Sequence, residues 1–232
     1  MSHELAIRPI AQIRTDFPAK FGIPRQAGLV PGLTGEIVFE PEYRTDEALR
    51  GLEGFSHIWL IWGFSANADR GWSPTVRPPR LGGNVRMGVF ATRSPFRPNG
   101  LGLSCVRLTG FRRDDREGTV LLVEGADMLD GTPIYDIKPY VPYADSIPDA
   151  ACGFAPDEGK LLEVDFPARL LAEIPEGKRA ALLSVLAHDP RPQYQQDAGR
   201  TYGMGFAGFE IRFQVAEGCV HVTEVQPVEP SA

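Results

Sequence analysis

The sequence is poor in cysteine and in long apolar runs. The 3 cysteines, Cys105, Cys152 and Cys219, are far apart and form no C-x-x-C pair, so neither a redox couple nor a thiolate metal site is indicated. We expect them to be small buried hydrophobes. The N-terminal segment MSHELAIRPIAQIR has no continuous apolar stretch, and no run of about 18 apolar residues occurs anywhere. The sequence therefore predicts a cytoplasmic protein without a membrane partner.

Motifs for metal, nucleotide and hydrolase chemistry are also missing. The histidines at positions 3, 57, 188 and 221 share no metal-ligand spacing, so no metal is expected. His57 lies in an apolar strand pattern and is expected to be a hydrogen-bonded structural histidine. The segment Gly203–Gly208 reads G-x-G-x-x-G, but a strand pattern follows it where a dinucleotide-binding unit needs a helix. We interpret it as a flexible turn.

Acidic residues are absent from one long interval. The net charge of −6 and the pI of about 5.3 argue against a nucleic-acid partner. Yet residues 71–113 contain no Asp or Glu and 8 arginines, at positions 77, 80, 86, 93, 97, 107, 112 and 113. Arginine also outnumbers lysine by 20 to 4, and its planar fork suits phosphate and base stacking. This arginine block indicates an anionic ligand, and a solvated basic face is the alternative.

Short apolar runs separated by Gly and Pro dominate the first 145 residues. Helical periodicity there is limited to Thr45–Arg50, with Thr45 as N-cap and Gly51 as stop. Many strands, few helices and no βαβ alternation favour a mostly antiparallel sheet closed into a barrel over a Rossmann fold. The predicted strands are Gly35–Glu40, Phe55–Phe64, Val85–Thr92, Gly102–Phe111 and Thr119–Met128.

The C-terminal part has a different pattern. A strand is predicted at Glu163–Phe166 and a helix at Glu176–Ala187, with Ala180, Leu183, Val185 and Leu186 as its apolar positions. A hairpin is predicted around Glu217-Gly218, from Gly208–Val215 and Cys219–Val225. The segment Asp145–Gly159 is rich in Pro and Gly and is interpreted as a linker. We therefore predict a main domain at residues 1–146 and a small α+β domain at residues 147–232.

Three stretches carry candidate functional groups. Residues 86–104 enter a loop with two prolines, two arginines and Asn99, which indicates either a preformed ligand wall or a rigid strand connection. Residues 127–140 place Asp127, Asp130 and Asp136 within reach of the arginine block, where they would neutralise arginines or hold a cationic, hydroxyl-rich ligand. Residues 188–194 (HDPRPQY) either end the helix or present Asp, Arg and Tyr to RNA.

Five ordered motifs resemble those of one known family. They are residues 24–30 (PRQAGLV), 71–84 (GWSPTVRPPRLGGN), 91–104, 130–140 and 189–194, and the match that they mark covers nearly the whole chain. The chain resembles the TsaA-like (TrmO) family of tRNA methyltransferases. The resemblance implies a mainly β protein with a single-sheeted antiparallel β-barrel that binds S-adenosyl-L-methionine (SAM), a small α+β C-terminal domain and a homodimer. It also implies methyl transfer to N6 of threonylcarbamoyladenosine beside the anticodon of tRNA.

The resemblance also assigns cofactor-binding positions. They are Pro24, Arg25, Gln26, Ser65, Ala66, Arg93, Leu103, Asp127, Met128, Leu129 and Asp130. Close relatives carry His-Gln where this chain has Ser65-Ala66, so side-chain contacts there must be lost or replaced while backbone contacts persist. Gly100-Leu101 stands where the family often has Pro-Ile, which loosens that loop.

For the chemistry, a sulfonium is already a good electrophile, so positioning of the nitrogen dominates. We expect Asp189 to accept a hydrogen bond near N6 and Arg191 and Tyr194 to hold the nucleoside. Alternatives are a methyltransferase of the same fold with another substrate and a non-catalytic module that senses SAM or binds RNA. A pure scaffold would leave the arginine block unexplained.

Overall fold

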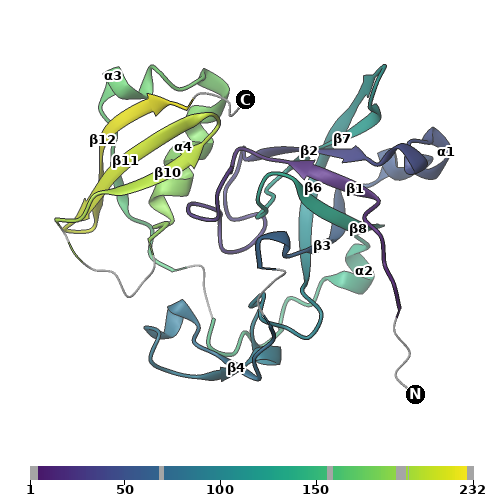
Figure 1. The fold of residues 1–232 in the computed structure, drawn as a ribbon, viewed down its shortest axis with the longest axis horizontal. Helices are drawn as coiled ribbons and strands as arrows, with labels where there is room; N and C mark the ends of the chain where they lie inside the picture. Colours follow the sequence, from purple (N-terminus) through teal and green to yellow (C-terminus); the bar gives the residue numbers. More distant parts are fainter. Residues whose placement is uncertain (1–4, 68–70, 156–158, 192–196, 198, 229–232) are drawn as a thin grey trace.

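The computed structural model describes residues 5–67, 71–155, 159–191, 197 and 199–228. Strands dominate it, in one sheet built from the first 139 residues and a second built from the last 70 (Figure 1). The mainly β class is confirmed. Among the described residues, no helix combines the length and the apolar character that crossing a membrane requires.

Six strands of the first sheet pair in a closed ring. The order is β1 (Ala11–Arg14), β2 (Thr34–Phe39), β7 (Gly118–Glu124), β6 (Leu101–Asp114), β3 (His57–Gly63) and β8 (Thr132–Pro139). β8 pairs back with β1, and every pairing in the ring is antiparallel. Alternate residues point inward, and Ile13, Ile37, Ile58, Leu60 and Leu121 in the core are 0% exposed.

One strand predicted from the sequence is wrong. Val85–Thr92 forms only the short β5 (Met87–Gly88), which pairs with β4 (Thr75–Val76), and then the 3-10 helix η5 (Val89–Ala91). Val89 is the only one of these η5 residues that is buried, so the run has no apolar face to cover a core. β7 ends at Glu124, before Gly125 takes a φ of 85°, and not at Met128 as predicted.

The predicted short helix is confirmed as α1 (Asp46–Leu49). Thr45 precedes it in extended conformation but makes no side-chain capping bond, and Gly51 follows with a φ of 89°. Several short elements escaped the sequence patterns because each is a single turn. They are η1 (Pro41–Tyr43), η2 (Leu52–Gly54), η3 (Ser65–Asn67), η4 (Pro79–Leu81) and α2 (Pro142–Asp145).

The second sheet has the order β10 (Tyr202–Phe206), β11 (Phe209–Ala216), β12 (Cys219–Pro227) and β9 (Glu163–Asp165), with β9 parallel to β12. The predicted hairpin is confirmed: Glu217 and Gly218 both have positive φ, 53° and 79°, as a two-residue turn requires. Two helices accompany the sheet, α3 (Ala168–Leu171) and α4 (Glu176–Ala187).

The buried face of α4 differs from the predicted one. Its buried residues are Ala181, Leu182, Val185 and Leu186, so of the apolar positions named from the periodicity Ala180 and Leu183 are not buried. Helical periodicity alone is compatible with either set of residues. The packing of α4 against the sheet determines which set is buried. The glycines of G-x-G-x-x-G are also placed differently: Gly203 and Gly205 lie within β10, and only Ala207-Gly208 form a turn.

The prediction of buried cysteines is wrong as well. Cys152 is exposed, and Cys105 and Cys219 are half-buried. Cys105 lies on β6 between Ser104 and Val106, which are both buried, so strand alternation turns its side chain to the outer face. Burial raises the pKa of its thiol.

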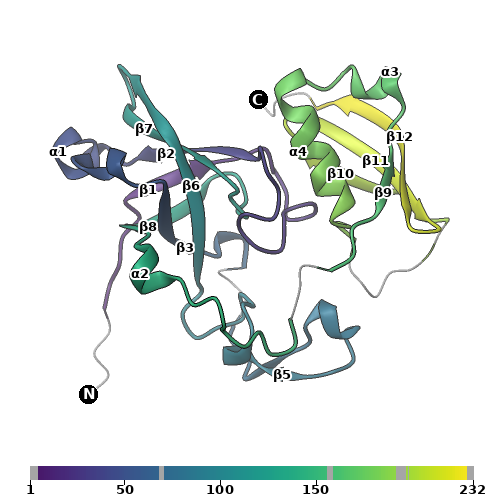
Figure 2. The same cartoon turned by 180° about the vertical axis from the view of Figure 1, so that it is seen from behind.

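A long connection between β1 and β2 joins the two sheets. We call residues 15–33 the bridging segment; Phe17, Val30 and Leu33 of this segment belong to the core of the second sheet. The ring of Phe17 lies 5.5 Å from that of Phe206, and the Ala207 amide donates to the Asp16 carbonyl at 2.9 Å. In Figure 2 the segment, in dark violet, lies between the ring and the second sheet. Residues 24–26 are therefore held between the two sheets.

Candidate functional site

The structure brings three groups of predicted cofactor residues together. Gln26, on the bridging segment, accepts a hydrogen bond from Arg93 Nη1. The Gly28 amide donates to the Gly125 carbonyl at 2.8 Å, and a β-carbon on Gly125 would lie 3.1 Å from Gly28 Cα. The bridging segment, the loop after η5 and the β7–β8 connection therefore meet, with close backbone contact that depends on glycine.

Asp127 lies at the centre of this meeting point. Ser104 Oγ donates to Asp127 Oδ1 at 2.6 Å, and Trp62 Nε1 donates to Ser104 Oγ at 3.0 Å. Burial raises the pKa of the Asp127 carboxyl, although the Ser104 hydroxyl and the Arg93 charge oppose that shift. The carboxylate is therefore held in one orientation.

Sequence reasoning missed Trp62 and Ser104. Ser104 is 3% exposed on the inward face of β6, which is otherwise apolar from Gly102 to Leu108. A single hydroxyl at an inward position of an apolar strand could have pointed to Ser104, because a buried polar group needs a hydrogen-bond partner.

The other residues of the β7–β8 connection fasten it to the bridging segment. Asp130 Oδ1 accepts from the Thr15 amide at 2.9 Å, and Thr15 Oγ1 donates to the Met128 carbonyl at 3.0 Å. The Met128 side chain is 1% exposed in the ring core, so a ligand at the surface would meet only its backbone. Leu129 is half-buried and Asp130 is exposed.

Ser65 and Ala66 lie in η3, which Lys20 ties to the bridging segment. Lys20 Nζ donates to the Ala66 carbonyl at 2.6 Å and also to Asn67 Oδ1. Leu103 is 55% exposed and lies opposite Ile61 on the neighbouring strand β3. Ser65 and Ala66 are therefore exposed beside the segment that carries Pro24 to Gln26, and Leu103 is accessible on β6.

The turn after α4 also contacts the bridging segment. Asp189 has a φ of 49°, and its carboxylate accepts from Arg191 Nε at 2.8 Å and from Nη2 at 2.9 Å. Arg25 Nη2 donates to the carbonyls of Asp189 and Arg191 at 3.4 and 3.3 Å. Burial lowers the pKa of Arg25, whereas the hydrogen bond to Asp189 raises that of Arg191.

These contacts bear on the predicted roles in this turn. Asp189 Oδ1 accepts from both the backbone amide and Nε of Arg191, whereas Oδ2 accepts from Arg191 Nη2 and retains a further lone pair, so an additional hydrogen bond to Oδ2 is compatible with the pair. The pair orients both side chains in a rigid turn. Tyr194, the third predicted residue, lies outside the described residues.

The arginine block separates into two groups. Arg107, Arg112 and Arg113 lie on β6 and pair with acidic residues from other strands and helices: Glu124 at 3.9 Å, Glu36 at 2.8 Å and Asp46 at 2.8 Å respectively. The other arginines lie in residues 71–99. The expectation that all three carboxylates would meet the block is wrong: Arg93 acts on Asp127, but Asp136 pairs with Lys138 at 2.9 Å.

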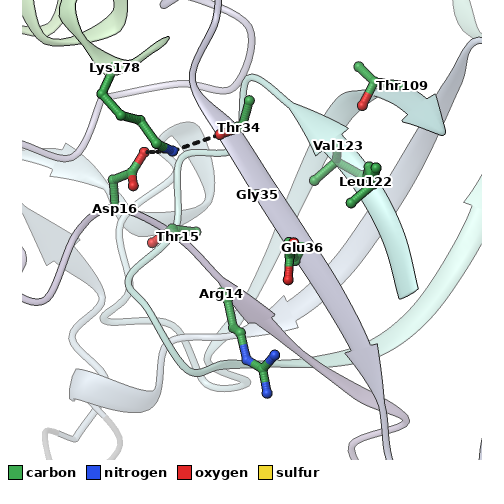
Figure 3. Close-up of a pocket in the computed structure, with 10 residues that line it drawn as sticks. All are labelled: Arg14, Thr15, Asp16, Thr34, Gly35, Glu36, Thr109, Leu122, Val123 and Lys178. Carbon is green, nitrogen blue, oxygen red and sulfur yellow. Dashed lines mark hydrogen bonds and ion pairs between the residues drawn. The ribbon is translucent and has the colours of Figure 1, made fainter. Parts of the chain in front are cut away.

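A cavity of about 320 Å³ lies elsewhere, between the ring and α4. Its lining mixes Arg14, Asp16, Glu36 and Lys178, and it includes none of the predicted site residues that the structure describes. Figure 3 shows Lys178 reaching from α4 to Asp16 and Thr34, at 2.7 and 2.8 Å. The cavity therefore belongs to the contact between the two sheets' units and not to the predicted site.

Comparison with known families decides the assignment. The model of the tRNA-methyltransferase O N-terminal domain matches residues 12–146, and that of the TrmO C-terminal domain matches residues 160–228. The chain belongs to the TrmO family. The family membership predicted from the five sequence motifs is confirmed.

TrmO relatives match nearly end to end. The tRNA (adenine(37)-N6)-methyltransferase of Escherichia coli K12 is 41% identical over 227 residues, which cover 94% of this chain and 96% of the relative. A putative S-adenosylmethionine-dependent methyltransferase of Pseudomonas aeruginosa is 46% identical, over 92% and 93% of the two chains. The crystal structure of TrmO from P. aeruginosa superposes with a TM-score of 0.77 at 35% identity, covering 97% of this chain and 99% of that one.

Proposed function

We propose that this protein is a SAM-dependent methyltransferase that modifies N6 of adenine 37 in tRNA, with threonylcarbamoyladenosine as the target nucleoside. Membership of the TrmO family over both of its domains supports the activity. So does a relative of that name that is 41% identical across 94% of the chain. The observation that carries the site is the pair of Arg25 hydrogen bonds, which joins the cofactor candidates to the Asp189–Arg191 turn.

The residues around Asp127 fit SAM. SAM carries a cationic amino group and a sulfonium, ribose hydroxyls and a carboxylate, and it needs carboxylate, cationic and apolar partners together. A half-buried carboxylate beside Arg93, the backbone of the β7–β8 connection and the exposed Leu103 offer this set. The residues that would hold it are the predicted ones, Pro24, Arg25, Gln26, Ser65, Ala66, Arg93, Leu103, Asp127, Met128, Leu129 and Asp130.

When bound, SAM supplies a methyl group on a positively charged sulfur. The protein's task is to hold the acceptor nitrogen in line, and such positioning is a large part of catalysis for a reaction with a good electrophile. Arg191 and Tyr194 hold the nucleoside, and Asp189 accepts a hydrogen bond from the N6 proton. Because Arg191 fixes the Asp189 carboxylate, Asp189 orients the nitrogen, and the N6 proton that the methyl group replaces leaves to solvent.

We also propose the domain organisation, the oligomeric state and the location of the protein. We regard the closed ring as the β-barrel that the family resemblance implies, with a domain at residues 1–146 and a second at residues 147–232. A homodimer in the cytoplasm, where tRNA is the substrate, completes the proposal. Sedimentation of the purified protein tests the dimer, and cell fractionation tests the location.

The direct test uses purified protein, tRNA and SAM with a labelled methyl group. Wild type transfers label to tRNA that carries threonylcarbamoyladenosine, whereas Asp189→Asn and Arg191→Lys lower kcat by about tenfold or more, the usual effect of losing an oriented polar group. Calorimetry with SAM gives unchanged affinity for both variants. SAM binding without label transfer by wild type would instead favour a sensing module, and transfer to a small molecule another substrate.

A further inference from the structure

The arginines of residues 71–99 differ from those of β6 in their surroundings. We call this stretch the arginine excursion: it leaves the ring after η3, forms β4, η4, β5 and η5, and returns to the ring at β6. Figures 1 and 2 show it projecting away from the ring, at the foot of both views. It contains no acidic residue.

Four of its five arginines form no ion pair with the described residues. Within the described part of the chain, no ion pair involves Arg77, Arg86, Arg93 or Arg97, whereas all three arginines of β6 have one. Arg77 and Arg86 are exposed, and Arg86 donates only a long hydrogen bond, 3.4 Å, to the Thr75 hydroxyl among the described residues. Exposed, uncompensated guanidinium groups are groups that phosphate oxygens pair with.

Exposed aromatic rings accompany these charges. Trp72 is 56% and Phe90 is 73% exposed, and the Arg97 guanidinium lies 5.6 Å from the centre of the Phe90 ring. Arg97 also donates to the carbonyls of Val89 and Thr92, at 3.2 and 2.7 Å, so the loop around Phe90 is fixed from within. Rigidly presented aromatic rings beside cations are typical of surfaces that bind unpaired bases.

The excursion is continuous with the proposed site. Arg93 binds Gln26 of the bridging segment, and the charge of Arg80 is close enough to lower the pKa of Arg25, after the larger effect of burial. Arg25 in turn contacts the Asp189–Arg191 turn. An RNA strand with its target base at the Asp189–Arg191 turn would therefore lie beside the arginine excursion.

We propose that the arginine excursion binds the anticodon stem-loop of the substrate RNA, with Arg77 and Arg86 on backbone phosphates and Trp72 and Phe90 stacked on unpaired bases. This inference rests on the proposed function and adds the surface that selects RNA. A symmetric contact in which this surface meets the same surface of a second copy fits poorly, because like charges would repel and the cores of such interfaces are depleted of charge.

The test compares two double variants. Arg77→Gln with Arg86→Gln removes two guanidinium groups that have no acidic partner among the described residues. Arg107→Gln with Arg113→Gln removes two exposed ones that are already paired on β6. Binding of a synthetic anticodon stem-loop RNA is measured without SAM, and KM for tRNA is measured with it, both across a range of salt concentrations.

We expect the first variant to weaken RNA binding and raise KM on the order of tenfold. It should also reduce the slope of log K against log salt by about 1.4, or about 0.7 for each phosphate that no longer meets an arginine. SAM affinity and kcat at saturating tRNA stay at wild-type values. The β6 variant behaves like wild type. Trp72→Ala and Phe90→Ala each weaken stem-loop binding on the order of tenfold because base stacking is removed.

Equal KM and equal salt slope in both double variants would overturn the inference. So would a loss of self-association in the Arg77 and Arg86 variant, because the excursion would then be covered by a second copy. Failure of the proposed function looks different: wild type would then bind stem-loop RNA without methylating tRNA, and the binding comparison would still decide the role of the excursion.

Discussion

Replacing Ser104 with alanine is expected to destabilise the protein, and more strongly at pH 8 than at pH 4.5. Ser104 Oγ donates to Asp127 Oδ1 at 2.6 Å and accepts from Trp62 Nε1 at 3.0 Å. Losing a hydrogen bond to a carboxylate costs about 1.5–3 kcal/mol, and leaving the buried indole N–H without a partner costs about 1–3 kcal/mol. At pH 8 we therefore expect a total of about 3–5 kcal/mol.

The pH dependence follows from Asp127. Burial raises the pKa of this carboxyl in the folded protein above its unfolded value, and the Ser104 hydroxyl opposes the shift. A raised carboxyl pKa means that the folded state binds more protons, so this group's contribution is most favourable below the unfolded pKa and is lost as pH rises through the folded pKa. Ser104→Ala raises the pKa of Asp127 in the folded state further. The variant therefore loses more stability than wild type as pH rises through that range.

At pH 4.5 the carboxyl is closer to its neutral form, for which the missing bond is an ordinary one of about 0.5–1.5 kcal/mol. The penalty should therefore shrink by about 1–2 kcal/mol relative to pH 8. Urea unfolding followed by circular dichroism at both pH values measures it. Thr132→Val is the matched control, because Thr132 is 2% exposed and bonds the neutral Leu129 carbonyl at 2.7 Å. A Ser104→Ala penalty as independent of pH as that of the control would refute the argument.

Three further predictions concern side chains near the site. Gly102→Ala drives a β-carbon into the Trp62 indole and should cost about 1–3 kcal/mol in urea unfolding, as overpacking does; a Gly100→Ala control, in open space, should cost less than about 1 kcal/mol. Lys178→Met removes the 2.7 Å ion pair with the Asp16 carboxylate and should lower the free energy of unfolding by about 1 kcal/mol. A double-mutant cycle with Asp16→Asn that gives no coupling energy between the two residues would contradict this. Arg25→Lys keeps the charge but loses the Nη2 group that donates to both carbonyls, so kcat should fall on the order of tenfold, and Arg25→Gln should lower it further. Equal kcat for wild type and both variants would remove Arg25 from the positioning role.

Part of the strand pattern could be predicted because alternation on one strand is a local property, but β1, β8 and β10 were not predicted. β6 shows this alternation from Leu101 to Leu108. The residue types of the Glu217-Gly218 turn likewise predicted the hairpin. Val85–Thr92 misled the prediction because β-branched and aromatic residues also occur in exposed loops that Pro and Gly shape. No feature of the local sequence distinguishes such a run from a strand. Only packing against a core does.

The site was predictable as a set of motifs but not as an arrangement. The block of arginines is continuous in sequence, yet β6 carries three of them to Glu124, Glu36 and Asp46, which only strand pairing brings there. The bridging segment is a further case: it connects β1 and β2, but its apolar residues belong to the core of the second sheet. Arg25 meets Asp189 for that reason, across 164 positions of sequence.

The central claim is N6-methylation of adenine 37 in tRNA, and nucleoside mass spectrometry tests it most directly. Total tRNA is compared from cells that lack this protein, from the same cells carrying it again, and from cells carrying Asp189→Asn. We predict that the N6-methylated threonylcarbamoyladenosine is absent from the first, restored in the second and strongly reduced in the third. The same amount of the methylated nucleoside in all three would contradict the account.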